Sequence, residues 1–138
     1  DKFQTHIIRC GNVYGYNRSM RFDAIINKFM FEANFQGKIN IHGNGSQKRP
    51  FVFIDTVAAA LMNTMDNQKT SGTFNLVEDN FEVNDIVEAL KTVYPDLEMI
   101  YINHNMRMRE LVVDAKQDEE AVIRLTQRLR TFKEQFTF

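Results

Sequence analysis

The chain has 138 residues, of which 43% are hydrophobic and 25% are charged, and its formal net charge is −1. This composition is typical of one folded domain with a buried core and excludes an intrinsically disordered chain. Acidic and basic residues are interspersed along the sequence, so no basic face is expected that could bind nucleic acid through its phosphates.

The cysteine content and the apolar runs indicate the cellular compartment of the protein. Cys10 is the single cysteine, which excludes an intrachain disulfide and favours a reducing environment. The longest apolar run, Val57–Met62, is too short to span a membrane, and no charged-then-apolar leader opens the sequence. We therefore expect a cytoplasmic protein. The chain begins at Asp1 and enters a strand pattern within a few residues, so we expect a piece of a longer protein.

The first part of the chain alternates between strand and helix patterns. Thr5–Arg9 favours a β-strand that Gly11 ends, and Asn12–Gly15 is predicted to form a turn. A helix is predicted from Phe22 to Phe35, ending at Gly37. Its apolar residues recur at helical spacing: Ile25, Ile26, Phe29, Met30 and Ala33.

The stretch Ile41–Asp55 is predicted to form a strand, a glycine turn and a second strand. Gly43 and Gly45 adopt positive φ at little cost, which permits a sharp turn and close approach to a bound group. Arg49 follows the turn and offers a rigid fork of donors suited to a phosphate. On this stretch alone, an ordinary hairpin with Lys48 and Arg49 solvated is the simpler interpretation.

The remaining elements continue the alternation. We predict a helix from about Asp55, a strand at Thr73–Val77, a helix from about Asn84 that ends before Pro95, and a strand at Glu98–Ile102. The helix from Asp55 carries one apolar face: Ala58, Leu61, Met62 and Met65. A final amphipathic helix is predicted from Val122, Leu125, Leu129, Phe132 and Phe136. Helices that alternate with short strands indicate an α/β fold.

The residues expected of a metal site or a cofactor loop are missing. The histidines are far apart in sequence and Cys10 has no partner cysteine, so we expect no metal site. The segment Gly43–Lys48 lacks the third glycine of a dinucleotide-binding loop, and a strand is predicted after it. No Tyr-x-x-x-Lys pair occurs. We therefore predict no catalytic residue in this chain.

Several side chains of a binding type remain. Asn75 lies inside an apolar strand pattern, where a buried amide needs hydrogen-bond partners that a ligand could supply. Each of the others has an ordinary alternative as a turn-forming or solvated residue: Asn12, His42, Arg49, Arg107 and Arg109.

The order of the motifs resembles one enzyme family. Arg9-Cys-Gly-Asn12-Val-Tyr-Gly15 is similar to the Arg-x-x-Asn-x-Tyr-Gly segment of the extended short-chain dehydrogenase/reductase family, which includes nucleotide-sugar epimerases and dehydratases. Ile41–Asp55 resembles its Gly-x-Gly-x-x-x-Arg-x-Phe-(Val/Ile)-His-(Val/Ile)-Asp-Asp block. Gly72-Thr-Phe-Asn75-Leu resembles its Gly-x-(Tyr/Phe)-Asn-(Leu/Ile) strand, and Phe81–Leu90 its following helix.

The resemblance covers only the C-terminal part of that family. It implies the C-terminal end of a Rossmann-type fold plus a small mixed α/β substrate-binding domain. Residues 1–15 would be the trailing strand and turn of the incomplete Rossmann core, and residues 16–138 the substrate-binding domain with its C-terminal amphipathic helix. The cofactor loop and the catalytic Tyr-x-x-x-Lys pair would lie upstream. The full-length protein would then use NAD or NADP and form a homodimer, whereas this fragment would be inactive and bind neither cofactor tightly.

The resemblance also implies roles for matched residues. Cys10 and Gly11 would lie close to the nicotinamide. The backbone of Asn40, Ile41 and His42 would flank the nucleobase of a nucleotide-diphosphate sugar. The substrate would also contact Asn75, and its diphosphate would contact Asn12, Arg49 and Arg109, with Arg107 as the alternative to Arg109.

Three departures from the family pattern leave alternatives open. Phe53 replaces a histidine, Thr56 replaces an aspartate, and no Leu-Gly-(Trp/Phe)-x-Pro element occurs near the C-terminus. A non-catalytic relative that senses nucleotides or binds proteins is therefore a second hypothesis. The final helix could pack on its own domain or pair with another chain. We also expect self-association through the strand at Thr5–Arg9, because Ile7 and Ile8 would be exposed there.

Overall fold

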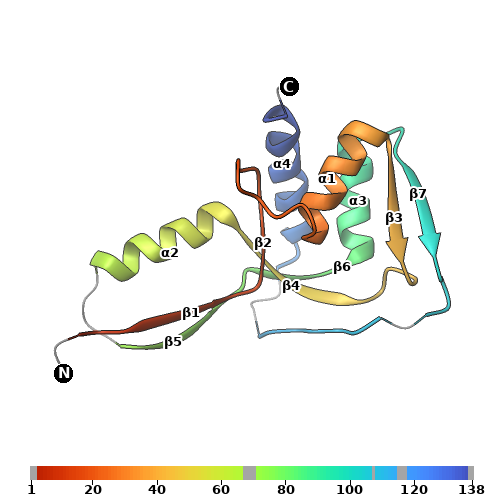
Figure 1. Ribbon diagram of the computed structural model, residues 1–138. Helices are drawn as coiled ribbons and strands as arrows, with labels where there is room; N and C mark the ends of the chain where they lie inside the picture. Colours follow the sequence, from red (N-terminus) through yellow and green to blue (C-terminus); the bar gives the residue numbers. More distant parts are fainter. Residues whose placement is uncertain (1–2, 67–70, 107, 115–117, 137–138) are drawn as a thin grey trace.

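A computed structural model describes residues 3–66, 71–106, 108–114 and 118–136. Strands and helices alternate, which confirms the α/β class (Figure 1). The elements are β1 (His6–Cys10), β2 (Asn12–Tyr14), α1 (Ile25–Gln36), β3 (Lys38–His42), β4 (Lys48–Phe53), α2 (Ile54–Asp66), β5 (Gly72–Leu76), β6 (Asp79–Glu82), α3 (Val83–Val93), β7 (Glu98–Ile102) and α4 (Ala121–Glu134).

The strands form three small sheets that join distant parts of the chain. β1 pairs in parallel with β5, and β3 pairs in parallel with β7. β4 lies between β2, which is parallel to it, and β6, which is antiparallel. The hairpin interpretation of Ile41–Asp55 is therefore wrong, because β3 and β4 each pair with other strands.

The turn predicted at Asn12–Gly15 is also wrong. Asn12–Tyr14 is a strand, and its residues lie opposite Phe51–Phe53 of β4. β6 was not predicted at all. Both strands are short and take their hydrogen bonds from β4, a partner that local sequence patterns do not reveal.

The core lies between α1, α3, α4 and β3. α1 buries Ile26, Phe29, Met30 and Ala33 at helical spacing, and Gly37 ends it in the left-handed conformation with φ of 67°. α4 buries Leu125, Leu129 and Phe132 against this core. The final helix therefore packs its apolar face on its own domain, as one of the two alternatives predicted.

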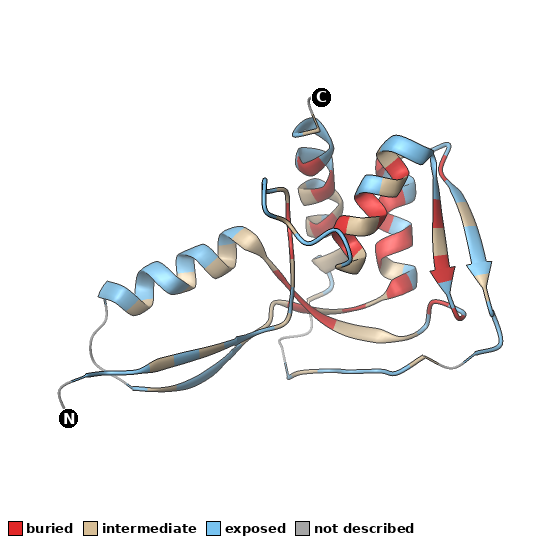
Figure 2. Ribbon diagram, in the orientation of Figure 1, coloured by how far each residue is buried: buried red, intermediate tan, exposed pale blue. Residues whose placement is uncertain are grey.

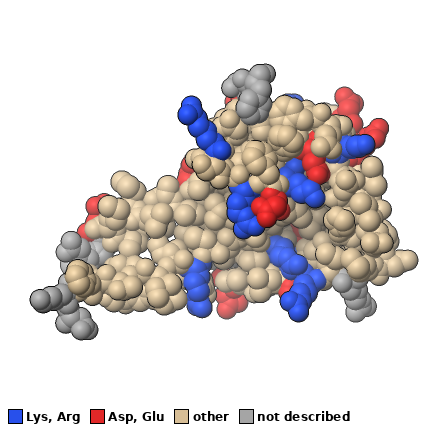
Figure 3. All heavy atoms as spheres, viewed as in Figure 1, with Lys and Arg blue, Asp and Glu red and all other residues tan. Residues whose placement is uncertain are grey.

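α2, β1 and β5 form an arm that projects from this body (Figure 1). α2 has the predicted apolar face, but none of its described residues is buried (Figure 2). Leu61, Met62 and Met65 are 51%, 62% and 75% exposed. Few charged side chains cover the arm on the face shown in Figure 3. None of the helices in the described ranges is both long and apolar enough to cross a membrane.

Candidate functional site

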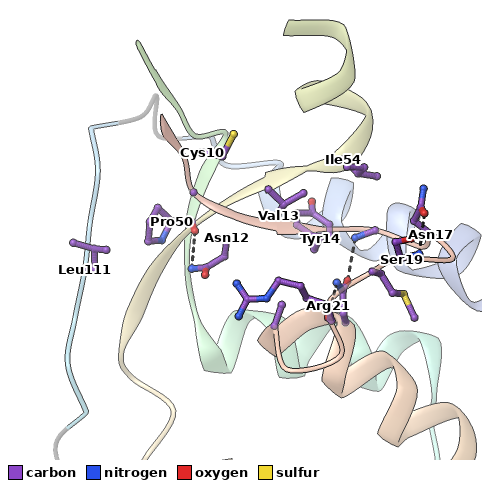
Figure 4. Close-up of a pocket in the computed structure, with 15 residues that line it drawn as sticks. Cys10, Asn12, Val13, Tyr14, Asn17, Ser19, Arg21, Pro50, Ile54 and Leu111 are labelled. Carbon is purple, nitrogen blue, oxygen red and sulfur yellow. Dashed lines mark hydrogen bonds between the residues drawn. The ribbon is translucent and has the colours of Figure 1, made fainter. Parts of the chain in front are cut away.

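Two adjoining cavities lie beside β2 and the start of α1. The larger, of about 600 Å³, is lined by Cys10–Gly15 and by the loop that leads into α1 (Figure 4). The smaller, of about 340 Å³, lies between α1, β3 and β4. Three residues contribute to both walls, so the cavities meet at Asn12, Arg21 and Ala24.

β2 holds Asn12 at this junction. Asn12 lies opposite Phe51 in the β2–β4 register, and its side-chain nitrogen donates a 3.1 Å hydrogen bond to the carbonyl oxygen of Pro50. This bond fixes the amide, and no donor among the described residues binds its oxygen. A ligand that offers an N–H or O–H group can therefore bind there.

Cys10 and Gly11 lie just before Asn12 and line the larger cavity. A Cβ atom at Gly11 would lie 3.0 Å from the carbonyl oxygen of Pro50, so the site has no room for a larger residue. β1 thus ends beside the cavity, where the backbone N–H of Gly11 donates a 3.0 Å hydrogen bond to the carbonyl of Leu76. Ligands of parallel α/β sheets bind at such carboxyl ends of strands.

The smaller cavity brings together three of the predicted residues: Asn40, His42 and Arg49. Arg49 is half-buried, and the hydrogen bond recorded for its guanidinium is a 3.4 Å contact with the carbonyl of Lys48. No carboxylate among the described residues pairs with it. Its other donors can therefore bind an anion. The side chain of Ile41 is buried in the core, so only its backbone could contact a ligand.

The glycine turn shapes the outer wall of the smaller cavity. Gly43 and Gly45 have φ of 77° and 79°, as their sequence pattern predicted. A Cβ at Gly45 would lie 2.1 Å from Oδ1 of Asn84, and one at Gly43 would lie 2.9 Å from Cγ of Met108. The two glycines therefore let α3 and the segment after β7 approach closely, and Met108 lines the cavity.

Other predicted residues lie outside these two cavities. Asn75 is exposed on β5 and lines a separate cavity beside α2, so its expected burial is wrong. Arg109 is exposed and lies between Met108 and Leu111, which line the smaller and the larger cavity. Arg107 lies outside the described residues.

The sequence did not single out Asn27, whose side chain holds the loop before α1. Asn27 is 3% exposed, accepts a 3.1 Å hydrogen bond from the backbone N–H of Gly15 and donates one of 3.1 Å to the carbonyl of Arg21. A buried amide on the apolar face of a predicted helix is the signal that could have revealed it. Asn27 fixes the loop that carries Arg21 into both cavity walls.

Arg128 on α4 contacts the end of β2 through Tyr14. It donates a 2.9 Å hydrogen bond to the hydroxyl of Tyr14 and pairs with Glu78 at 3.0 Å. Its guanidinium also lies 4.5 Å from the ring centre of Phe53. Burial raises the pKa of Tyr14 to about 12. The Tyr14 hydroxyl is therefore neutral near pH 7 and held in place by Arg128.

Comparisons with known proteins give a family and a fold. The model of the NAD dependent epimerase/dehydratase family matches residues 1–76. No curated protein matches in sequence.

Solved structures similar to the chain include the NAD-dependent NDP-hexosamine 5,6-dehydratase TunA of tunicamycin biosynthesis, with a TM-score of 0.73 and 20% identity over 94% of this chain and 44% of that one. A UDP-N-acetylglucosamine 4-epimerase from Methanobrevibacter ruminantium M1, in complex with UDP-N-acetylmuramic acid, has a TM-score of 0.76 and 21% identity over 95% and 45%. MoeE5 in complex with UDP-glucuronic acid and NAD has a TM-score of 0.71 and 24% identity over 95% and 46%. The chain thus shares their Rossmann-type fold and spans less than half the length of each.

Proposed function

Because this chain belongs to the NAD dependent epimerase/dehydratase family, we propose that it forms the nucleotide-sugar-binding portion of an NAD- or NADP-dependent epimerase or dehydratase. The observation that carries the proposal is the pair of adjoining cavities, whose walls bring together Asn12, Asn40, His42 and Arg49. A nucleotide sugar is an elongated ligand with an anionic centre, which suits two cavities that meet at polar side chains.

The nucleotide would occupy the smaller cavity and the sugar the larger. Arg49 would bind the diphosphate, because its donors have no carboxylate partner among the described residues. Asn40 and His42 would flank the nucleobase, and Asn12 at the junction would contact the sugar side of the diphosphate. Arg109 and Asn75 line neither of these two cavities. Their contacts with the substrate remain predictions for the full-length protein.

Cys10 and Gly11 would lie against the nicotinamide of NAD or NADP at the end of β1. The cofactor would supply hydride chemistry to the sugar in the larger cavity. The sequence has no Tyr-x-x-x-Lys pair for the acid–base steps of that chemistry. We therefore propose that the full-length protein is the enzyme, acts as a homodimer, and that this chain alone has no turnover.

The division of the chain would follow the sheets. β5 pairs with β1, and α2 joins β4 to β5 in sequence. We propose that the Rossmann-type portion comprises residues 1–15 together with α2 and β5, and that the rest of residues 16–138 forms the substrate-binding portion.

Calorimetric titration of the chain with UDP-glucose, dTDP-glucose and GDP-mannose tests this proposal. Arg49→Ala is expected to weaken the tightest of these ligands by roughly 10- to 100-fold, the usual effect of losing a charge-assisted hydrogen bond. Lys48→Ala is the matched control, since Lys48 neighbours Arg49 but lines neither cavity. Unchanged affinity of Arg49→Ala for all three ligands would contradict the proposal.

A non-catalytic relative that senses nucleotides would bind the same ligand with the same residues. The replacement of histidine by Phe53 does not favour it, because the Phe53 ring has a packing role against Arg128. Hydride transfer by the full-length protein, measured as a change in absorbance of the nicotinamide on adding nucleotide sugar, distinguishes the enzyme from the sensor.

A further inference from the structure

Arg21 is the charged residue that the walls of the two cavities have in common. Figure 4 shows its guanidinium extending toward the side chain of Asn12 on the opposite wall. Arg49 lines the smaller cavity as well. An anion at the junction would therefore have one guanidinium from the loop before α1 and a second from β4.

Arg21 forms an ion pair with Asp23 that a ligand can replace at little cost in free energy. Nε of Arg21 donates to Oδ1 of Asp23 at 3.1 Å, and Nη2 donates to Oδ2 at 2.7 Å. Both side chains are largely exposed, at 76% and 72%. Ion pairs between exposed side chains contribute little to stability because water solvates both partners well. A diphosphate, with more charge and more acceptor oxygens than Asp23, would compete effectively for the same donors.

The other cations nearby are less suited to this position. Lys28 lines only the smaller of the two cavities and lies 3.8 Å from Glu32, its ion-pair partner. Arg109 is exposed and lines neither cavity. By contrast, the backbone of Arg21 is fixed, since its carbonyl accepts a hydrogen bond from the buried Asn27.

We propose that Arg21 binds the diphosphate of the ligand opposite Arg49, and that Asp23 holds the Arg21 guanidinium until the ligand replaces it. This inference rests on the proposed function and adds a binding residue to it. Asp23 then acts against binding, because its carboxylate competes for Arg21 and repels the diphosphate.

Calorimetry on the chain with the tightest-binding of UDP-glucose, dTDP-glucose and GDP-mannose, and with the matching nucleoside, tests the inference. Arg21→Ala is expected to weaken the nucleotide sugar about tenfold or more, and Arg21→Lys by less, while the nucleoside changes by no more than about twofold. Asp23→Asn is expected to tighten the nucleotide sugar about two- to fivefold. Arg18→Ala is the matched control, since Arg18 is exposed and lines neither cavity.

Any of the following outcomes would overturn the inference. If Arg21→Ala binds as Arg18→Ala does while Arg49→Ala is weakened, Arg21 has no role and the proposed function stands. If Arg109→Ala is weakened and Arg21→Ala is not, the second guanidinium is Arg109. Equal losses for nucleotide sugar and nucleoside would show a damaged loop instead of a lost phosphate contact. If the unmodified chain binds none of the nucleotide sugars, the proposed function fails together with the inference.

Discussion

Arg128 links the C-terminal helix to the strand that carries Asn12. It contacts the Tyr14 hydroxyl, the Glu78 carboxylate and the Phe53 ring. A second arginine of the same helix, Arg124, donates to the buried carboxylate of Asp79 at 2.9 Å. Two guanidiniums one turn apart on α4 thus hold the turn between β5 and β6. α4 occupies the part of the sequence where the family pattern has Leu-Gly-(Trp/Phe)-x-Pro.

The Glu78 carboxylate should make stability depend on pH. Burial raises the pKa of Glu78, but hydrogen bonds from Arg128 and from the backbone N–H of Phe53 outweigh it, so the net pKa is lowered. A lowered folded-state pKa stabilises the fold above the ordinary pKa of 4.5, and this contribution is lost as the pH falls below it. Glu78→Gln should therefore cost about 1–2 kcal/mol at pH 7.

Urea unfolding at several pH values measures this effect. The difference between the unmodified chain and Glu78→Gln should be constant near neutral pH and shrink as the pH falls below 4.5. Glu88→Gln serves as a control, because Glu88 is exposed on α3. A difference that does not change with pH would contradict the role assigned to the Glu78 charge.

Sequence patterns predicted residues whose role depends on local geometry better than residues whose role depends on distant neighbours. Gly43 and Gly45 have the positive φ that their spacing indicated, because a tight turn is a local demand. The burial expected of Asn75 was wrong, because burial depends on which strands cover β5. Arg21 was missed because its importance comes from two cavity walls that meet only in the folded chain.

At the scale of elements, α2 and α4 share an amphipathic pattern but differ in how far their apolar faces are buried. Both carry apolar residues at helical spacing. α4 buries its apolar face against the core with α3, whereas the apolar face of α2 is open among the described residues. Helical spacing predicted where the helices form, but it could not predict which face finds a partner.

Substitutions of one apolar residue on each helix should differ in their effect on stability, because only the residue on α4 is buried. Phe132→Ala on α4 removes a side chain that is 2% exposed and should cost about 3–5 kcal/mol of unfolding free energy. Leu61→Ala on α2 removes one that is 51% exposed and should change stability by no more than about 0.5 kcal/mol. Urea titration followed by circular dichroism measures both. Similar losses at the two positions would show that α2 is packed in solution.

At the scale of the molecule, the arm concentrates exposed apolar surface at one end. Ile7 on β1 and Phe74 on β5 are 52% and 45% exposed, and Leu61, Met62 and Met65 on α2 are exposed as well. Surfaces of this kind are associated with contacts between proteins or with aggregation. The body, by contrast, contains the buried apolar core.

The arm should therefore drive self-association of the chain. Sedimentation velocity at increasing concentration should show association, and Leu61→Lys combined with Met62→Lys should reduce it, because both charges would have to be desolvated in the contact. Ile123→Lys is a control on the body, since Ile123 is 60% exposed on α4. A chain that stays monomeric at all concentrations would contradict this expectation.

The parallel pairing of β3 with β7 has a consequence for folding kinetics. Lys38 lies opposite Glu98 and His42 opposite Ile102, so this sheet closes only after most of the chain has been made. Ile39 and Ile41, both buried in the finished core, must wait for partners from the other half of the sequence. Pairing between residues so distant in sequence slows folding, because the entropy of closing the intervening loop is lost before the contacts form. The smaller cavity, whose wall includes Asn40 and His42, thus depends on a pairing between distant parts of the chain.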